Sequence, residues 1–293
     1  GLAARRRLAH RRGARATGGR RGACAVGLAA RGGQQAELEV GAQAARLEAA
    51  AAPPGGEQEL VLVDGSNCLH RAFHGTYSAG LVNSRGEPTG ALKVFMQMLL
   101  KIQADLSPTH ICVMMDARNS TASRRALDAE YKANRGSMSD DLREQLPKAR
   151  TALEAMGVCW KEHKEFEADD LIGLYARVAS KDAEVCIISS DKDLAQLVGP
   201  RVRILSPGDK AEKAMDAEAV EKKWGVRPDQ LGDLFALAGD AVDNIQGVPG
   251  IGPKKAANLL VHYRDLAGVL SAARALDPDA LAAEAEAKED EAK

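Results

Sequence analysis

Apolar residues along the chain follow two different spacings. Short runs rich in Val, Ile and Leu predict strands near residues 60–63, 110–115, 185–189 and 202–205. Longer amphipathic stretches predict helices near residues 89–105, 140–156, 168–180 and 216–224. Strands that alternate with helices are typical of a mainly parallel central sheet flanked by helices. We therefore expect an α/β fold for residues 58–227.

The pattern changes at Pro228, after which it is wholly helical. Helices are predicted near 228–238 and 253–263, and the loop between them is rich in Gly, Asp and Pro. We expect a small helical subdomain over residues 228–275. The remaining stretch, 276–293, combines acidic residues with alanine and predicts a solvated tail.

Residues 1–57 have a composition unlike the rest of the chain. They are rich in Ala, Gly, Arg and Gln, and the first 36 residues hold nine arginines and no acid. An Arg-rich, acid-free start resembles an organelle transit peptide, although these residues lack the serine that such peptides favour. Two interpretations stay open: a leader directing the protein to a chloroplast or mitochondrion, or no targeting segment and a place in the cytoplasm or nucleoid.

The net charge of −1 conceals a strong segregation of charge. Setting the nine early arginines aside leaves 31 basic residues against 41 acidic ones. An acidic body argues against a protein that coats nucleic acid through a general basic surface. It does not exclude DNA binding, because carboxylates gathered around metal ions are neutralised locally.

The cysteines and the apolar runs further limit the class of protein. The five cysteines lie far apart and form no CxxC pair, which argues against a disulfide framework or a zinc site and fits a reducing intracellular compartment. No apolar run approaches the roughly 20 residues needed to cross a bilayer. We expect a soluble protein.

Acidic residues recur at the ends of the predicted strands. Asp64, Asp116 and Asp191 each follow an apolar run, and the carboxyl ends of parallel strands meet at one edge of a sheet. A single such aspartate is more often a helix cap, but the repetition favours a shared pocket. Carboxylates that close need cations, because like charges raise one another's pKa. Oxygen ligands without a His or Cys cluster favour Mg²⁺ or Mn²⁺.

Basic residues occur in two segments of this acidic body. Arg124, with Lys132 and Arg135 in the string YKANR, could hold a phosphate and stabilise negative charge as it develops. The glycine-rich run 247–255 opens a helix, and its amide groups could hold a DNA phosphate without reading base sequence. A tight turn between two helices, with no ligand, explains the same run equally well.

The motifs form one ordered series. Between Leu60 and Tyr263 the chain carries, in order, VDGSN, NSRGEPTGA, YKANR, EADD, SSDKDLAQLV and GDAVDNIQGVPGIGPKKAA. Together they resemble the 5′-3′ exonuclease domain of bacterial-type DNA polymerase I, in the flap endonuclease superfamily. The resemblance implies a PIN-like catalytic domain over 58–227 and a helix-hairpin-helix DNA-binding subdomain over 228–275.

The resemblance also assigns roles to residues. It implies two Mg²⁺ or Mn²⁺ ions, held by a first group, Asp64, Asp116, Glu167, Asp169 and Asp170, and by a second group, Asp191, Asp193, Asp240 and Asp243. It implies phosphate handling on a helical arch by Lys132, Arg135 and Arg124. DNA contacts would come from His70, Arg71, Tyr131, Gly247, Val248, Gly250, Ile251, Gly252, Lys254 and Lys255, with a K⁺ ion at the hairpin. Ser123, Gln246 and His70 depart from the family's usual residues.

The expected activity is hydrolysis of DNA phosphodiesters near a 5′ end or at a 5′ flap, in replication and repair. The resemblance implies DNA with 5′ flaps, nicks or ends as partner, together with a DNA polymerase, and we expect a monomer. Two alternatives remain: a PIN-type endoribonuclease with a similar acidic pocket, and a non-catalytic protein that binds DNA junctions.

Overall fold

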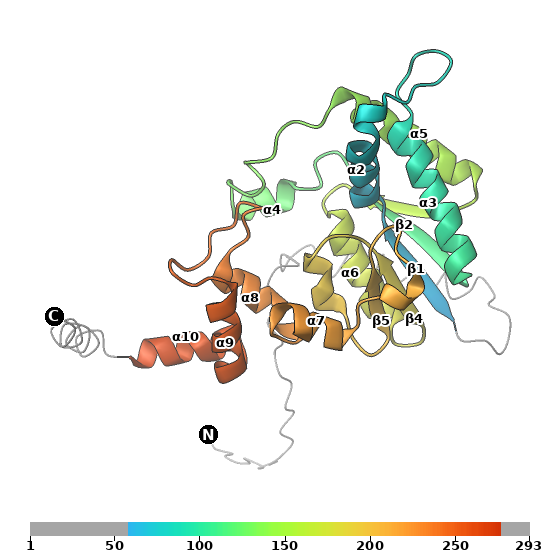
Figure 1. Cartoon of the computed structure of the whole chain (residues 1–293). Coiled ribbons are helices and arrows are strands. Elements are labelled where there is room, and N and C mark those ends of the chain that lie inside the picture. The colour runs from blue at the N-terminus through green and yellow to red at the C-terminus, as the bar shows by residue number, and fades with distance from the viewer. Residues whose placement is uncertain (1–57, 277–293) are drawn as a thin grey trace, which may run out of the picture.

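A five-stranded parallel sheet forms the centre of the molecule (Figure 1). The computed structural model describes residues 58–276, so the predictions for the leader and for the tail beyond residue 276 lie outside the described residues. In spatial order the strands are β3 (Cys159–His163), β2 (His110–Asp116), β1 (Glu59–Asp64), β4 (Glu184–Ile188) and β5 (Val202–Leu205). The expected parallel α/β fold is confirmed.

The strand order places a crevice at the carboxyl ends of β1 and β4. From β1 the chain moves outward to β2 and β3, then returns to add β4 and β5 on the other side. The segments that follow β1 and β4 therefore turn to opposite faces, and ligands of open parallel sheets bind where the order reverses in this way. Asp64 ends β1, and Asp191 follows β4 by three residues.

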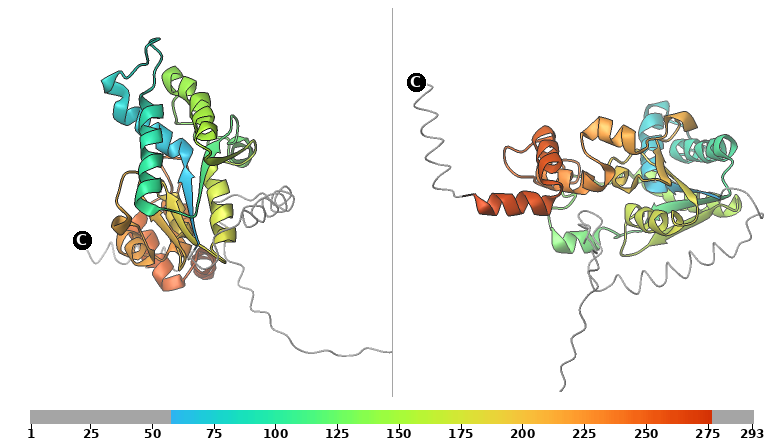
Figure 2. Two further views of the ribbon diagram at one scale, coloured as in Figure 1. Left: turned by 90° about the vertical axis from the view of Figure 1, so that its right-hand side faces the viewer. Right: turned by 90° about the horizontal axis from the view of Figure 1, so that it is seen from below.

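Two hydrophobic cores cover the two faces of the sheet. Alternate residues of a strand point to opposite faces, so Leu62 packs in one core and Val63 in the other. Helices α2 (Gly65–Thr76), α3 (Gly90–Leu106) and α5 (Asp140–Ala155) cover one face. Helix α6 (Ala168–Ala179) covers the other, and Figure 2 shows α3 and α6 on opposite sides of the strands.

The C-terminal helices share the core on the α6 face. They are α7 (Ala217–Trp224), α8 (Leu231–Ala238), α9 (Pro253–Tyr263) and α10 (Leu266–Ala275), and α8 is preceded by a 3-10 turn, Pro228–Gln230. The buried Gln230 side chain donates to the carbonyls of Leu260 and Arg264 at 3.2 and 2.7 Å, which ties the end of α9 to the start of α8. Within residues 58–276, no helix is long and apolar enough to span a membrane.

The predicted strands and helices occur within one or two residues of their expected bounds, except that the helix expected from residue 228 begins as a 3-10 turn and becomes α8 at Leu231. One strand and three α-helices were missed. Strand β3 is an edge strand whose residues are half-buried or exposed, so it lacks an apolar run. Helix α2 buries Gly65, Cys68, Leu69, Ala72 and Phe73, but only Leu69 and Phe73 are large apolar residues, which gives a weak apolar pattern. The short α4 (Ala122–Leu127) and the terminal α10 bury no residue fully, which leaves little apolar periodicity to detect.

Candidate active site

The three strand-end aspartates converge at the crevice. Burial, with smaller contributions from the charges of Asp116 and Asp191, raises the pKa of Asp64 from 3.8 to about 7, although two hydrogen bonds act to lower it. Asp64 Oδ1 accepts from the amide of Asn67 at 3.0 Å and so caps α2, while Oδ2 accepts from the Ser189 hydroxyl at 2.8 Å. The helix-cap explanation and the shared-pocket explanation therefore both hold for Asp64.

The start of α6 brings a second set of acids to the same place. Glu167 and Asp170 form a capping box, in which the Glu167 amide donates to Asp170 Oδ2 at 3.0 Å. Asp116 Oδ1 accepts from the Ala168 amide at 2.7 Å, which joins the end of β2 to this helix start. One carboxylate oxygen of Glu167, Oε1, is buried without a hydrogen-bond partner, although Arg124 Nη1 lies 3.3 Å away.

The remaining acids come from the segment after β4 and from the loop after α8. Asp193, Asp240 and Asp243 offer carboxylate oxygens that all lie within 4.8 Å of one another. Burial and the charge of Asp191 raise the pKa of Asp193 to about 6. Burial also raises the pKa of Asp191, and Asp169 and Asp243 add to that effect. The charges of the two predicted acidic groups therefore act on one another.

Basic side chains of residues 122–135, the segment called the arch below, face these acids. Arg124 lies on α4, and Lys132 and Arg135 follow in irregular chain. Arg124 donates to both carboxylate oxygens of Asp169 at 2.9 and 3.0 Å and to Asp170 at 2.6 Å. Lys132 Nζ lies 2.5 Å from Glu167 Oε2. Burial alone would lower the pKa of both basic groups, but the carboxylates raise both above their usual values. The arch thus holds permanent positive charge against the first acidic group.

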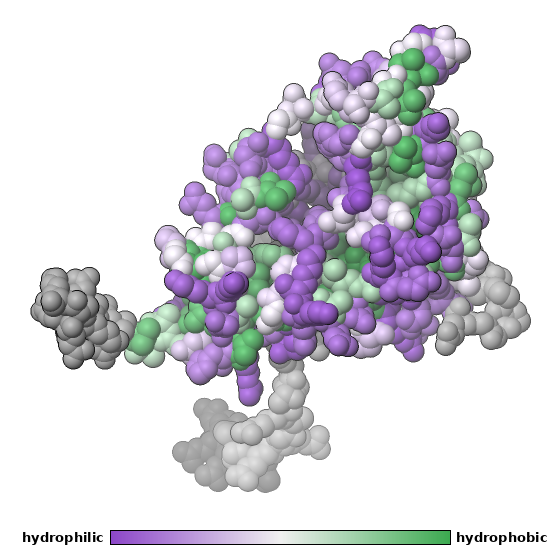
Figure 3. All heavy atoms as spheres, viewed as in Figure 1, coloured by the Kyte–Doolittle hydropathy of each residue, from purple (hydrophilic) through white to green (hydrophobic). Residues whose placement is uncertain are grey.

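The arch also contacts the loop that carries Asp240 and Asp243. Arg135 pairs with Asp243 at 2.5 Å, and the Lys132 amide donates to the Asp243 carbonyl at 2.9 Å. The side chains of Asn134 and Asn244 donate across the same contact at 2.9 and 2.8 Å. Figure 1 shows α4 away from the sheet and beside this loop, and Figure 3 shows the region as a hydrophilic projection.

The hairpin between α8 and α9 presents exposed basic residues. Gly250 has φ +80°, a conformation that favours glycine, and Pro253 occupies the first turn of α9. Lys254 and Lys255 are exposed, and Lys255 Nζ donates to the Gly250 carbonyl at 3.0 Å. A different need explains Gly247, because a Cβ there would lie 2.3 Å from the backbone of Ala238.

Other predicted DNA contacts lie in different surroundings. His70 and Arg71 are exposed on α2. The protein around the His70 ring still removes part of its solvation, and this partial burial, with the charges of His74 and Arg135, lowers its pKa. Tyr131, in contrast, is only 5% exposed, and its hydroxyl accepts from Arg124 Nη1 at 2.7 Å. In this arrangement Tyr131 positions Arg124 and does not face solvent.

Sequence reasoning missed several residues of the site. The Ser189 hydroxyl donates to Asp64, the Ser190 hydroxyl donates to Asn67 Oδ1 at 2.7 Å, and Lys192 Nζ lies 2.7 Å from Asp240. The available signal was their position inside the strings VDGSN and SSDKD, next to the acids. Gly65, in the first of these strings, lets α2 start against β2, since a Cβ there would lie 2.4 Å from Met115 Sδ.

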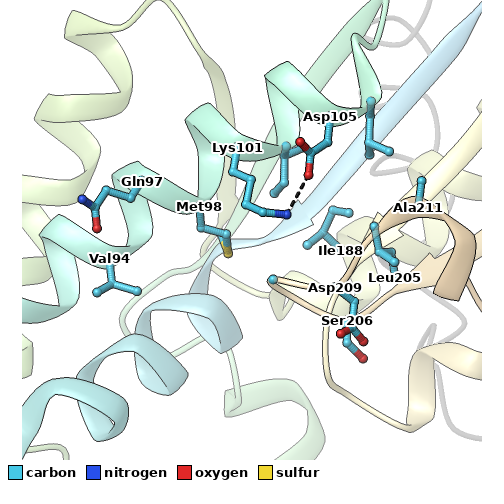
Figure 4. Close-up of a pocket in the computed structure, with 13 residues that line it drawn as sticks. Val94, Gln97, Met98, Lys101, Asp105, Ile188, Leu205, Ser206, Asp209 and Ala211 are labelled. Atoms are coloured by element: carbon cyan, nitrogen blue, oxygen red, sulfur yellow. Dashed lines mark hydrogen bonds and ion pairs between the residues drawn. The ribbon is translucent and has the colours of Figure 1, made fainter.

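A separate cavity lies away from the acids. It has a volume of about 220 Å³ between α3 and the end of β5, and Met98, Ile102 and Leu205 line it together with the ion pair of Lys101 and Asp105 (Figure 4). None of the nine predicted metal ligands lines it. This cavity is therefore separate from the acidic residues at the strand ends.

The acidic crevice fits hard divalent cations. Arg124, Lys132, Arg135 and Lys192 pair with its acids, yet among the described residues they do not balance nine carboxylates. Burial is the main cause of the raised pKa of Asp64 and of Asp193, and the charges of neighbouring acids add to it. The donors are oxygens alone, as Mg²⁺ and Mn²⁺ prefer.

Comparisons with known proteins agree with this geometry. Residues 59–225 match the family model described as 5′-3′ exonuclease, N-terminal resolvase-like domain, and residues 226–293 match 5′-3′ exonuclease, C-terminal SAM fold. DNA polymerase I of Rhizobium leguminosarum is 42% identical over 73% of this chain, which spans 22% of that relative's length. A 5′-3′ exonuclease of Aquifex aeolicus is 36% identical over 72% of each chain.

Solved structures share the fold. The bacteriophage T5 5′-exonuclease with bound zinc ions matches with a TM-score of 0.60, over 75% of this chain and 81% of its own. The T5 flap endonuclease in a pseudo-enzyme–product complex with DNA and metal ions matches with a TM-score of 0.58, over 73% and 78%. Each is 22% identical, which shows the fold alone. The family models and the Aquifex relative decide the classification: this chain belongs to the 5′-3′ exonuclease family.

Proposed function

We propose that this protein is a divalent-metal-dependent nuclease that hydrolyses DNA phosphodiesters near a 5′ end or at a 5′ flap. The observation that carries the proposal is the gathering of nine carboxylates from separate segments at one crevice, faced by basic residues of the arch. Family membership supports the same activity. The DNA polymerase I relatives carry the matched region within much longer chains, which supports a polymerase as partner.

We assign the acids to two metal groups. Asp64, Asp116, Glu167, Asp169 and Asp170 would hold one ion, and Asp191, Asp193, Asp240 and Asp243 the other, with Mg²⁺ or Mn²⁺ as the natural ions. Bound there, the ions would stabilise charge on the phosphodiester oxygens and lower the pKa of the attacking water. The T5 relatives with bound metal ions support a divalent ion of some kind.

The arch cations supply the phosphate contacts in this proposal. Arg124 and Lys132 remain protonated, because their acidic partners raise the pKa of both. When ions neutralise those acids, the two side chains can turn their hydrogen bonds to the phosphate and stabilise its developing charge. Arg135, whose side chain is 49% exposed, lies at the rim, where it can meet the strand first.

The hairpin would hold the duplex away from the reacting phosphate. Its exposed glycines allow close approach of the DNA backbone, and the first amides of α9 with Lys254 and Lys255 would bind a phosphate without reading sequence. A K⁺ ion at this turn remains part of the proposal. On α2, the exposed His70 and Arg71 would contact the strand near the arch.

A labelled 5′-flap duplex tests the proposed function. We expect Mg²⁺-dependent cleavage that EDTA stops and that Asp191→Asn abolishes, while Asp105→Asn, in an exposed ion pair far from the crevice, cleaves normally. Single-stranded RNA of the same sequence should resist. Cleavage of RNA in preference to flap DNA would support the endoribonuclease instead. Flap binding in Ca²⁺ with no turnover in Mg²⁺ or Mn²⁺ would support a non-catalytic junction-binding protein.

A further inference from the structure

Lys192 lies between two acids of the second metal group. Its Nζ is 2.7 Å from Asp240 Oδ2 and 3.1 Å from Asp193 Oδ1. The same ammonium lies 4.3 Å from the centre of the Phe235 ring on α8, a cation–π distance. The Lys192 side chain is 35% exposed. It is therefore held by contacts from the segment after β4, from α8 and from the loop after α8.

The ammonium competes for the oxygens that a divalent ion would use. Asp193, Asp240 and Asp243 place carboxylate oxygens within 4.8 Å of one another, the spacing of ligands around one cation. Two cations that share such oxygens repel each other strongly at distances of a few ångströms. A divalent ion held by these three acids would lie within a few ångströms of Lys192 Nζ and would be opposed by its charge.

Lys192 differs from Arg124 and Lys132 in how its charge could move away from the acids. Arg124 lies on α4, which Figure 1 shows away from the sheet, and Lys132 lies in the turns that follow α4. Lys192 follows Asp191 and precedes Asp193 in the chain, and the Asp193 amide donates to Asp191 Oδ1 at 2.9 Å. Its backbone therefore stays with the site, and only the side chain can move aside.

We propose that Lys192 is a built-in competing cation, which occupies the second metal group until a divalent ion displaces its ammonium and which thereby sets the affinity of that site. This inference rests on the proposed metal site. The competing explanation is a purely structural one, in which Lys192 joins the sheet edge to the C-terminal helices through Asp240 and Phe235. If Lys192 has only this structural role, replacing it should lower the stability of the protein with and without metal and should not increase its metal affinity.

Mn²⁺ binding to the full chain, measured by calorimetry and by electron paramagnetic resonance without DNA, separates the two explanations. We expect Lys192→Met to bind Mn²⁺ at the weaker site at least about tenfold more tightly, because one positive charge no longer opposes the ion. The same variant should unfold at a lower temperature in EDTA and gain more from saturating Mn²⁺ than the wild type. Lys192→Arg, which keeps the charge, should retain the weak affinity.

Control variants locate the effect. Lys101→Met removes a lysine from an exposed ion pair outside the crevice and should leave Mn²⁺ affinity unchanged. Adding Asp193→Asn to Lys192→Met should cancel the gain. Unchanged or weaker Mn²⁺ binding by Lys192→Met, and by Lys192→Gln should the first variant not fold, would overturn the proposal while leaving the nuclease intact. A wild type that binds no Mn²⁺ would overturn the proposed function as well.

Discussion

Arg124 forms a two-pronged ion pair with Asp169, in which Nη2 lies 2.9 Å from Oδ1 and Nη1 lies 3.0 Å from Oδ2. The pair joins the arch to the start of α6 across 45 residues of sequence. Its geometry requires a planar guanidinium, which a lysine cannot replace. It brings the proposed phosphate-binding group, Arg124, into contact with a proposed metal ligand, Asp169.

Arg124→Lys should therefore slow cleavage. We expect the single-turnover rate on a saturating 5′-flap duplex to fall by about 100-fold, the usual scale for losing a preorganised charged donor. The exposed neighbour Arg125 provides the matched control, and Arg125→Lys should cleave within about twofold of the wild-type rate, as expected of a conservative change outside the site. Equal rates for the two variants would contradict the role given to Arg124.

Asp64 should make the metal-free protein sensitive to pH. Its pKa is 3.8 without neighbours and about 7 in the fold. Between these values the folded chain binds more protons than the unfolded chain, so stability falls as the pH rises from about 4 to about 7. In EDTA, the gain in thermal stability of Asp64→Asn over the wild type should be small at pH 5 and larger at pH 8. The same variant should not cleave DNA. Equal stability at pH 8 would count against the raised pKa.

Gly247→Ala should destabilise the C-terminal helices. The added Cβ would meet backbone atoms of Ala238 and Gly239 at 2.3 Å, and backbone cannot move aside as a side chain can. We expect a loss of about 3 kcal/mol in the free energy of unfolding, measured with urea. Gly252→Ala is the control from the same hairpin, since its Cβ would meet nothing within 4 Å and its φ is −88°. A smaller loss for Gly247→Ala than for Gly252→Ala would show that Gly247 does not pack tightly against Ala238 and Gly239.

Lys254→Ala with Lys255→Ala should weaken DNA binding in a salt-dependent way. Each lost phosphate contact lowers the slope of log affinity against log salt by about one. The affinity should fall equally for flaps of different sequence, because the contacts proposed for the hairpin are with the DNA backbone alone. Fluorescence anisotropy in Ca²⁺ at several salt concentrations measures both effects. The pair Lys222→Ala and Lys223→Ala on α7 should change neither, and an unchanged slope in the hairpin variant would exclude it as a phosphate grip.

The site could be predicted from sequence to the extent that it follows strand ends. Asp64, Asp116 and Asp191 converge because parallel strands present their carboxyl ends at one edge, and the structure brings them together. Asp240 and Asp243 lie far along the chain, and only the ordered motifs, not the residue pattern, linked them to this edge. Tyr131 was expected at the DNA and is buried under Arg124, because exposure depends on packing that no local pattern records.

The spacing of apolar residues alone predicted the parallel sheet with its helices. A strand buried on two faces and a helix buried along one stripe each have a characteristic spacing of apolar residues. The elements that bury no residue fully, β3, α4 and α10, escaped this prediction for the same reason. Tertiary structure alone decided which charges meet. Arg124 with Asp169, and Lys192 between Asp193 and Asp240, pair through contacts of the arch and of the loop after α8. Electrostatic energy depends on distance in space, and chain spacing does not fix that distance.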